Sequence, residues 1–206
     1  MRVGLIGAPG SGKSKLGRLI AKEYEITLVD NYVQRLQKAT NLALGPWSSY
    51  AEHMVVAGHR YAAEEKVGPT DRVTAGTMID TLTYAMVKSD VEFQYGTKNN
   101  TEKERIAAMY ASAQAGIRGL TLFLTETWDY DLSFFLPFSD DAAKKADPWS
   151  LALDNAYPAV IESYNPPYTW RLDGTTEERF GIVKESIDFI REKQETEATE
   201  AVEPTV

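Results

Sequence analysis

A run of residues near the start of the chain matches the pattern G-x-x-x-x-G-K-[ST] at every fixed position. The run is Gly7, Ala8, Pro9, Gly10, Ser11, Gly12, Lys13 and Ser14. Phosphate oxygens need several converging N–H donors, and glycines let a loop adopt the unusual dihedral angles that point those donors inward. A helix that follows such a loop also directs its electropositive N-terminal end toward the anion. The pattern therefore predicts that this segment, together with Lys15, binds a nucleoside triphosphate, which we take to be ATP.

Two side chains at the end of this P-loop have distinct predicted tasks. The Lys13 ammonium is expected to reach the β and γ phosphates, and the Ser14 hydroxyl is expected to be a ligand of Mg²⁺. The alternative is a glycine-rich turn that matches the pattern by chance. An apolar strand over 2–6 precedes the loop, and apolar residues at helical spacing follow it through about Tyr24. This context on both sides favours phosphate binding.

The segments around the loop predict an α/β protein. A second apolar strand over 26–29 completes a βαβ unit, which implies a parallel sheet covered by helices. Further helices are predicted over 31–40, 48–66, 78–87, 101–125 (in one or two pieces), 148–164 and 175–192, and further strands over 72–75, 133–138 and 168–172. We expect a three-layer α/β P-loop fold with a central parallel sheet of about five strands. It would form one domain over 1–190, followed by an acidic, mobile tail over 191–206.

Composition narrows the classes of function. The 206 residues carry a net charge of −8 and no cysteine, so disulfides and thiolate metal sites are excluded. No apolar run approaches the roughly 20 residues that cross a bilayer, which argues against a membrane protein. The acidic balance and the lack of a dense basic patch disfavour nucleic acid as the main partner, whereas a small phosphorylated metabolite needs only one local pocket. We expect a cytoplasmic protein, and a homodimer is compatible with the sequence.

The main groups of P-loop proteins differ in further motifs, and this sequence lacks two of them. A GTPase should carry N-K-x-D after a strand, and the sequence has none. A motor ATPase or a transporter should carry four apolar residues that run into an acidic residue, but the apolar strand over 133–138 ends in Ser139. Both absences favour a kinase that acts on a small molecule.

The order of five segments carries a resemblance to a known group. The segments are GAPGSGKS at 7–14, Asp30, MIDTLTYA at 78–85, YDLSFFLPF at 130–138 and TWRLDGTTEERF at 169–180. On them the sequence resembles the small P-loop kinases of the nucleoside and nucleotide kinase group, including the AAA-type domain of ribosylnicotinamide kinases. The resemblance covers most of residues 1–190. It implies transfer of the γ-phosphoryl group of ATP, with Mg²⁺, to a small nucleoside or nucleotide.

The resemblance assigns a task to Asp30, which follows the second predicted strand. In such kinases an acidic residue at this place faces the γ-phosphate, where it binds the acceptor hydroxyl, orients it as a base or holds Mg²⁺ through water. The carboxyl end of a parallel strand is also where such folds place their chemistry. The alternative task of Asp30 is to cap the helix predicted from residue 31.

A lid is expected over 139–147 by the same resemblance. The lid of these kinases normally supplies arginines that neutralise the transferring phosphoryl group, but here it holds Lys144 and Lys145 and no arginine. Lysines supply charge without the bidentate fork of arginine. The alternative is that both lysines are solvated in a polar loop.

The turn after the last predicted strand is expected to contact the nucleotide base. Asp173, Gly174 and Thr175 occupy the place where such kinases wrap the purine. The same turn is also suited to begin the last helix, because Thr175 and Glu178 have the spacing of a capping box. The two tasks are compatible.

The acceptor side departs from the pattern of these kinases. They usually carry an Asp-Arg or Glu-Arg pair just after the third strand, but Asp71 and Arg72 come before its apolar residues. Either Asp80 takes over part of this role, or substrate handling differs. The alternative for Asp80 itself is a surface or capping residue. Arg60 and His53 lie seven residues apart on one helix face, so they could frame a base and hold its phosphate. The alternative is an amphipathic helix with an exposed charged edge.

The sequence is also compatible with two other functions. One is a kinase that acts on a modified base or on ribosylnicotinamide. The other is a nucleotide-binding regulatory or assembly protein that hydrolyses ATP slowly or not at all, which the unusual third strand and the arginine-free lid favour.

Overall fold

The structure, a computed structural model, describes residues 1–30, 32–40, 48, 50–94, 111–123, 130–166 and 168–200. Its centre is a five-stranded sheet in the order β2-β3-β1-β4-β5, with every neighbouring pair parallel. The strands are β1 (Arg2–Ile6), β2 (Thr27–Val29), β3 (Arg72–Ala75), β4 (Leu132–Phe135) and β5 (Thr169–Arg171). The predicted parallel sheet is confirmed.

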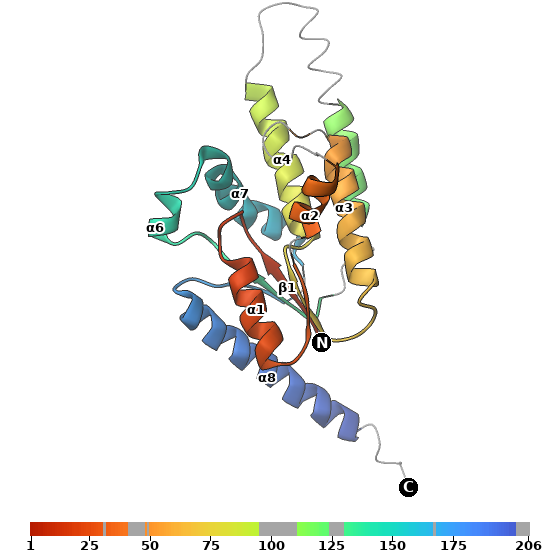
Figure 1. Ribbon diagram of the computed structural model, residues 1–206, viewed down its shortest axis with the longest axis vertical. Helices are drawn as coiled ribbons and strands as arrows, with labels where there is room; N and C mark the ends of the chain where they lie inside the picture. Colours follow the sequence, from red (N-terminus) through yellow and green to blue (C-terminus); the bar gives the residue numbers. More distant parts are fainter. Residues whose placement is uncertain are drawn as a thin grey trace, which may run out of the picture.

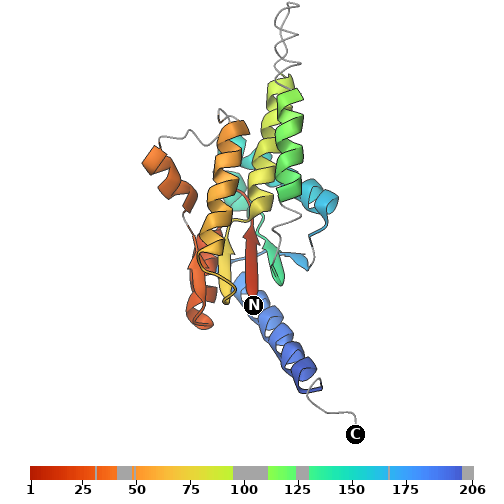
Figure 2. The same cartoon turned by 90° about the vertical axis from the view of Figure 1, so that its right-hand side faces the viewer.

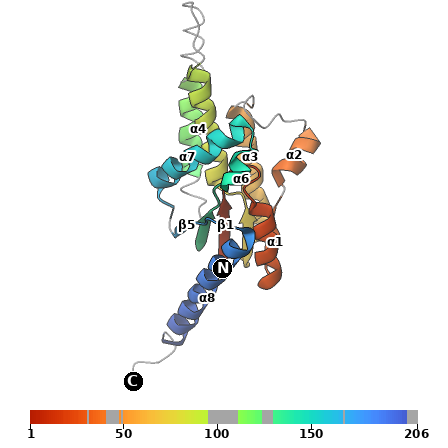
Figure 3. The same ribbon diagram turned by 90° about the vertical axis from the view of Figure 1, so that its left-hand side faces the viewer.

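Helices cover both faces of the sheet, which confirms the predicted three layers (Figure 1). One face carries α1 (Lys13–Glu23) and α8 (Thr176–Glu200), and the other carries α3 (Tyr50–Glu65), α4 (Met78–Gln94), α7 (Pro148–Tyr164) and a helical segment over 111–123. α2 (Tyr32–Thr40) packs against α3, and the short α6 (Asp140–Ala143) follows β4. Figures 2 and 3 show α3, α4 and the 111–123 helix side by side, with α8 leaving the body in the opposite direction.

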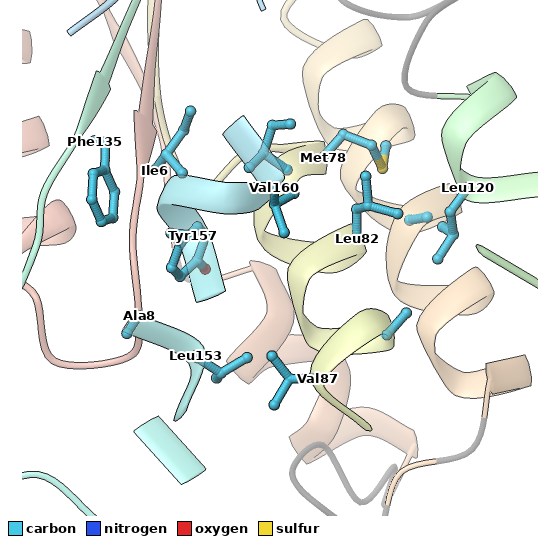
Figure 4. Packing of buried hydrophobic residues seen from close by; sticks show 13 residues of the cluster. Ile6, Ala8, Met78, Leu82, Val87, Leu120, Phe135, Leu153, Tyr157 and Val160 are labelled. Carbon is cyan, nitrogen blue, oxygen red and sulfur yellow. The ribbon is translucent and has the colours of Figure 1, made fainter. Parts of the chain in front are cut away.

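Alternation along β1 explains why the core has two parts. Val3 and Leu5 point to one face, where they pack in a cluster with Ile187 of α8. Ile6 points to the other face and packs in a cluster with residues of α3, α4 and α7, among them Tyr157 (Figure 4). The central strands β1, β3 and β4 are therefore buried on both sides, as expected for a parallel sheet.

Two helices are longer than the sequence predicts. α4 runs to Gln94 and not to residue 87, and α8 runs to Glu200 and not to residue 192. The extension of α8 has a simple cause, because residues 191–200 are mostly strong helix formers and contain neither glycine nor proline. Residues 191–200 of the predicted tail thus continue α8, while 201–206 lie outside the described residues.

β4 is shorter than predicted, because it ends at Phe135 and not at residue 138. Pro137 has no N–H group to continue the ladder of hydrogen bonds. Of the helix predicted over 101–125, residues 111–123 are helical, and the remainder lies outside the described residues. No helix in the described ranges is long and apolar enough to cross a bilayer.

Candidate active site

The loop between β1 and α1 has a backbone that requires glycine. Gly7, Gly10 and Gly12 have φ angles of 153°, 88° and 100°, which L side chains rarely adopt. A Cβ atom on Gly7 would also lie 2.6 Å from the Leu136 carbonyl oxygen. Gly12 is the N-cap of α1, and within the described residues no side chain caps this helix. The N–H groups of its first turn are therefore oriented toward the loop and suited to bind an anion.

Lys13 extends back over the loop that precedes it. Its Nζ atom donates hydrogen bonds to the carbonyl oxygens of Gly7 and Ala8, the latter at 2.9 Å, and lies 3.6 Å from Oδ1 of Asp80. Burial lowers the pKa of Lys13, and the neighbouring Asp80 carboxylate opposes this shift. A cation whose side chain is only 13% exposed thus lies at the centre of the loop.

Asp80 joins the P-loop to α4. Its carboxylate accepts hydrogen bonds from the Gly7 N–H at 3.1 Å, the Thr77 N–H at 2.6 Å and the Tyr157 hydroxyl at 2.9 Å. Nη1 of Arg60 lies 3.8 Å from the same carboxylate, and the Asp80 side chain is only 2% exposed. The alternative of a surface residue is therefore wrong, whereas the capping alternative is confirmed at the start of α4. A role of Asp80 toward the substrate stays a prediction.

Ser14 and Asp30 lie side by side at the mouth of the loop. The Ser14 hydroxyl donates a hydrogen bond of 2.8 Å to Oδ1 of Asp30, and Nη2 of Arg18 lies 3.9 Å from Oδ2. A hydroxyl next to a carboxylate is a set of hard oxygen donors that fits Mg²⁺. The alternative of a helix cap involves residue 31, which lies outside the described residues.

A cavity of about 490 Å³ opens from the P-loop toward α2, α3 and α4. Besides residues 9–15 of the loop and Asp30, its walls include Val33, Gln37, His53, Val56, Arg60, Gly76, Asp80, Thr81, Tyr84 and Trp149. His53 and Arg60 are both buried, so the alternative of an exposed charged edge is wrong for these two residues. His53 is also within hydrogen-bond distance of the Ser48 hydroxyl, at 3.0 Å.

Arg60 lies close to the end of the third strand. Its guanidinium lies 3.4 Å from the place that a Cβ atom on Gly76 would take, just beyond the end of β3. An arginine from α3 and an aspartate from α4 thus come together at the end of β3. No spacing rule within a single segment would reveal this pair.

The residues predicted for the lid do not line the cavity. Lys144 and Lys145 are exposed, and Nζ of Lys144 lies 3.6 Å from the exposed carboxylate of Asp141, one helical turn away. This arrangement agrees with the alternative given by the sequence, in which both lysines are solvated. A task in closing over the nucleotide stays a prediction.

The turn after β5 also lies outside the cavity wall. Asp173 binds the Arg171 guanidinium in a bidentate ion pair, which lowers the pKa of the Asp173 carboxyl. Thr175 and Glu178 form the predicted capping box, with hydrogen bonds of 2.7 and 3.3 Å. Gly174 has a φ angle of 93°, which suits the turn. Contact of this turn with a base stays a prediction.

Arg179 and Tyr157 are two residues of the site that the sequence analysis missed. Arg179 is buried and donates hydrogen bonds to the carbonyl oxygens of Ser11, at 2.9 Å, and Pro137, at 2.7 Å, and burial lowers its pKa. A signal was present, because Arg179 precedes two buried residues of α8, Val183 and Ile187, by four and eight positions. Tyr157 gave no comparable signal, since an apolar helix face does not reveal a hydroxyl contact.

Comparisons with known proteins agree with this geometry at the level of the fold. No family model and no curated protein matches the sequence. Deoxyadenosine kinase from M. mycoides, in complex with dATP, is similar in structure with a TM-score of 0.63 at 13% identity, over 91% of this chain and 100% of that chain. Thymidylate kinase from Ehrlichia chaffeensis has a TM-score of 0.58 at 12% identity, over 91% and 98% of the two chains.

A third similar structure belongs to a chain of which less than half is matched. NadR in complex with NR has a TM-score of 0.56 at 14% identity, over 84% of this chain but only 43% of that chain. At these identities the likeness shows the fold alone. The chain therefore has the fold of the small P-loop kinases.

Proposed function

We propose that this protein transfers the γ-phosphoryl group of ATP to a small nucleoside or nucleotide. The observation that carries the proposal is that one cavity is lined both by the P-loop and by side chains that could bind an acceptor. The P-loop, with Lys13 and the Ser14–Asp30 pair, forms one end, and the buried Arg60 and His53 form the other. The likeness in fold to known kinases also supports phosphoryl transfer.

The residues at the P-loop end have tasks that follow from their positions. The loop N–H groups and Lys13 would bind the phosphates, and Ser14 and Asp30 would hold Mg²⁺. Bound Mg²⁺ supplies positive charge that neutralises the charge developing during phosphoryl transfer. Asp30 would also orient the acceptor hydroxyl, so that catalysis depends mainly on positioning and charge.

The other end of the cavity suits a nucleoside or nucleotide acceptor. Val33, Val56, Tyr84 and Trp149 offer apolar and aromatic surface for a planar base. Arg60 adds a planar fork of N–H donors that fits a phosphate. Lys144 and Lys145 in the 139–147 lid would approach only when the lid closes, and the 173–175 turn would contact the base of ATP.

The test measures ADP release from Mg·ATP with and without a panel of nucleosides and deoxynucleoside monophosphates. We expect one acceptor to raise turnover manyfold, and Lys13→Ala to abolish turnover. Asp30→Asn should lower kcat while ATP still binds. If ATP binds but no acceptor changes turnover, the proposal is wrong.

A second candidate is a regulatory or assembly protein that hydrolyses ATP slowly or not at all. The exposed lysines at 144 and 145 favour it, because no described residue of the lid lines the cavity. A third is a kinase for ribosylnicotinamide or a modified base, which the likeness to NadR favours. Acceptor-independent ADP release would indicate the second candidate, and a response to ribosylnicotinamide alone would indicate the third. A cytoplasmic location fits all three candidates.

A further inference from the structure

A second surface of the molecule lies between β5 and α8, apart from the active site. It is a groove of about 420 Å³ whose wall includes Tyr168, Trp170, Glu185, Ser186, Phe189 and Lys193, here called the α8–β5 surface. It shares no wall residue with the cavity at the P-loop. β5 is one of the two edge strands of the described sheet, and Figure 3 shows α8 running out from the body next to it.

Three aromatic side chains of this surface are exposed, and two of them contact other aromatic rings. Tyr168, Trp170 and Phe189 are 63%, 42% and 64% exposed. The rings of Tyr168 and Trp170 lie 6.3 Å apart, and the Trp170 ring lies 5.8 Å from that of the buried Phe134. With about 200 Å² for each aromatic side chain, the three expose roughly 350 Å² together. This is close to half of the roughly 800 Å² that each partner contributes to a stable interface.

We propose that the α8–β5 surface is the contact between two copies of this chain, related by a twofold axis that passes near Phe189. Glu185 and Lys193 each lie four residues from Phe189, one on either side, so all three share a helix face. When two α8 helices cross antiparallel at Phe189, Glu185 of each copy comes opposite Lys193 of the other. The surface is thus complementary in charge to itself, as a twofold interface requires.

The acidic end of α8 also favours the antiparallel crossing. The chain carries a net charge of −8, and the segment after Lys193 contains several glutamates and no basic residue. Glu200 lies eleven residues beyond Phe189, or about 16 Å along the helix. The two acidic ends would thus be separated by about 30 Å, well beyond the Debye length of about 8 Å. A parallel crossing would bring them together.

Sedimentation equilibrium of the full chain tests this proposal. We expect a dimer for the unaltered protein and a monomer for Phe189→Glu, which places a charge at the centre of the contact. The matched control is Leu122→Glu, because Leu122 is 63% exposed but lies on the 111–123 helix. The control should remain a dimer. ATP binding should be unchanged in both variants.

Charge exchange tests the direction of the crossing. Glu185→Lys alone, or Lys193→Glu alone, brings like charges together twice in each dimer and should raise the dissociation constant about tenfold. The double variant E185K/K193E restores opposite charges and should return the constant to that of the unaltered protein. A monomeric unaltered protein, a dimer that only Leu122→Glu disrupts, or a double variant as weak as the single ones would overturn the proposal.

Discussion

The carboxylate of Asp80 should be the most important single charge for the stability of the site. Asp80→Asn keeps the size of the side chain and removes its charge. The carboxylate accepts four hydrogen bonds and lies 3.6 Å from Lys13 and 3.8 Å from Arg60. In the variant Lys13 and Arg60 lose this negative charge, and an amide N–H₂ group replaces one acceptor oxygen.

The size of the effect follows from these contacts. At an effective dielectric constant of about 20, each charge pair contributes about 4–5 kcal/mol, offset by the loss of solvation. Removing one partner of a buried ion pair costs about 3–5 kcal/mol in practice. We therefore expect Asp80→Asn to lower the free energy of unfolding by about 3–5 kcal/mol, a large part of the 5–15 kcal/mol of an ordinary domain.

Urea unfolding of the two proteins measures this loss, with Asp30→Asn as the matched control at the same cavity. Asp30 binds the Ser14 hydroxyl and lies near the exposed Arg18, so its charge should contribute at most about 2 kcal/mol. A loss below about 1 kcal/mol for Asp80→Asn, or an equal loss for both variants, would refute the reasoning.

The pH dependence gives a second check of the same variant. Burial lowers the pKa of Lys13 and Asp80 raises it, so removal of the Asp80 charge lowers this pKa further. A lysine whose pKa is lower in the folded state destabilises the protein while it is protonated, and this cost falls as pH rises through the folded pKa toward the unfolded value of about 10.4. The difference in stability between the two proteins should therefore be largest near neutral pH and shrink as the pH approaches 10.

Three further predictions concern the elements that support the site. Gly7→Ala should abolish ATP binding, measured by calorimetry, because its Cβ would lie 2.6 Å from the Leu136 carbonyl oxygen. Arg179→Met should weaken ATP binding and lower the free energy of unfolding by about 2–4 kcal/mol, because it removes two buried charge-assisted hydrogen bonds; an unchanged dissociation constant would contradict this. Asp147→Ala should cost about 1 kcal/mol through loss of the α7 N-cap, whereas Asp147→Asn should not. The hydrogen bond from Ser150 lowers the Asp147 pKa, so this contribution is present above about pH 4 and is lost as pH falls through the lowered pKa, which urea unfolding at several pH values would show.

The sequence by itself determined the P-loop and the parallel sheet around it. Both depend on local rules: glycine spacing fixes a loop that only unusual dihedral angles can form, and apolar periodicity separates strands from helices. The placement of Asp30 after β2 follows from the same rules, because the carboxyl ends of parallel strands meet at one edge. Its contact with Ser14 is the consequence.

Only the tertiary structure decided which distant residues complete the site. Arg60 and Asp80 are twenty positions apart on two helices, and Arg179 meets Ser11 across most of the chain. Such contacts depend on how helices cross the sheet, which residue spacing within one segment does not encode. The tertiary structure also decided which polar residues are buried. An Asp at the start of a helix gives the same sequence pattern whether its side chain faces water or lies beneath the P-loop. The lengths of α4 and α8 also differed from the prediction, because a helix can continue beyond the part of it that packs on the core.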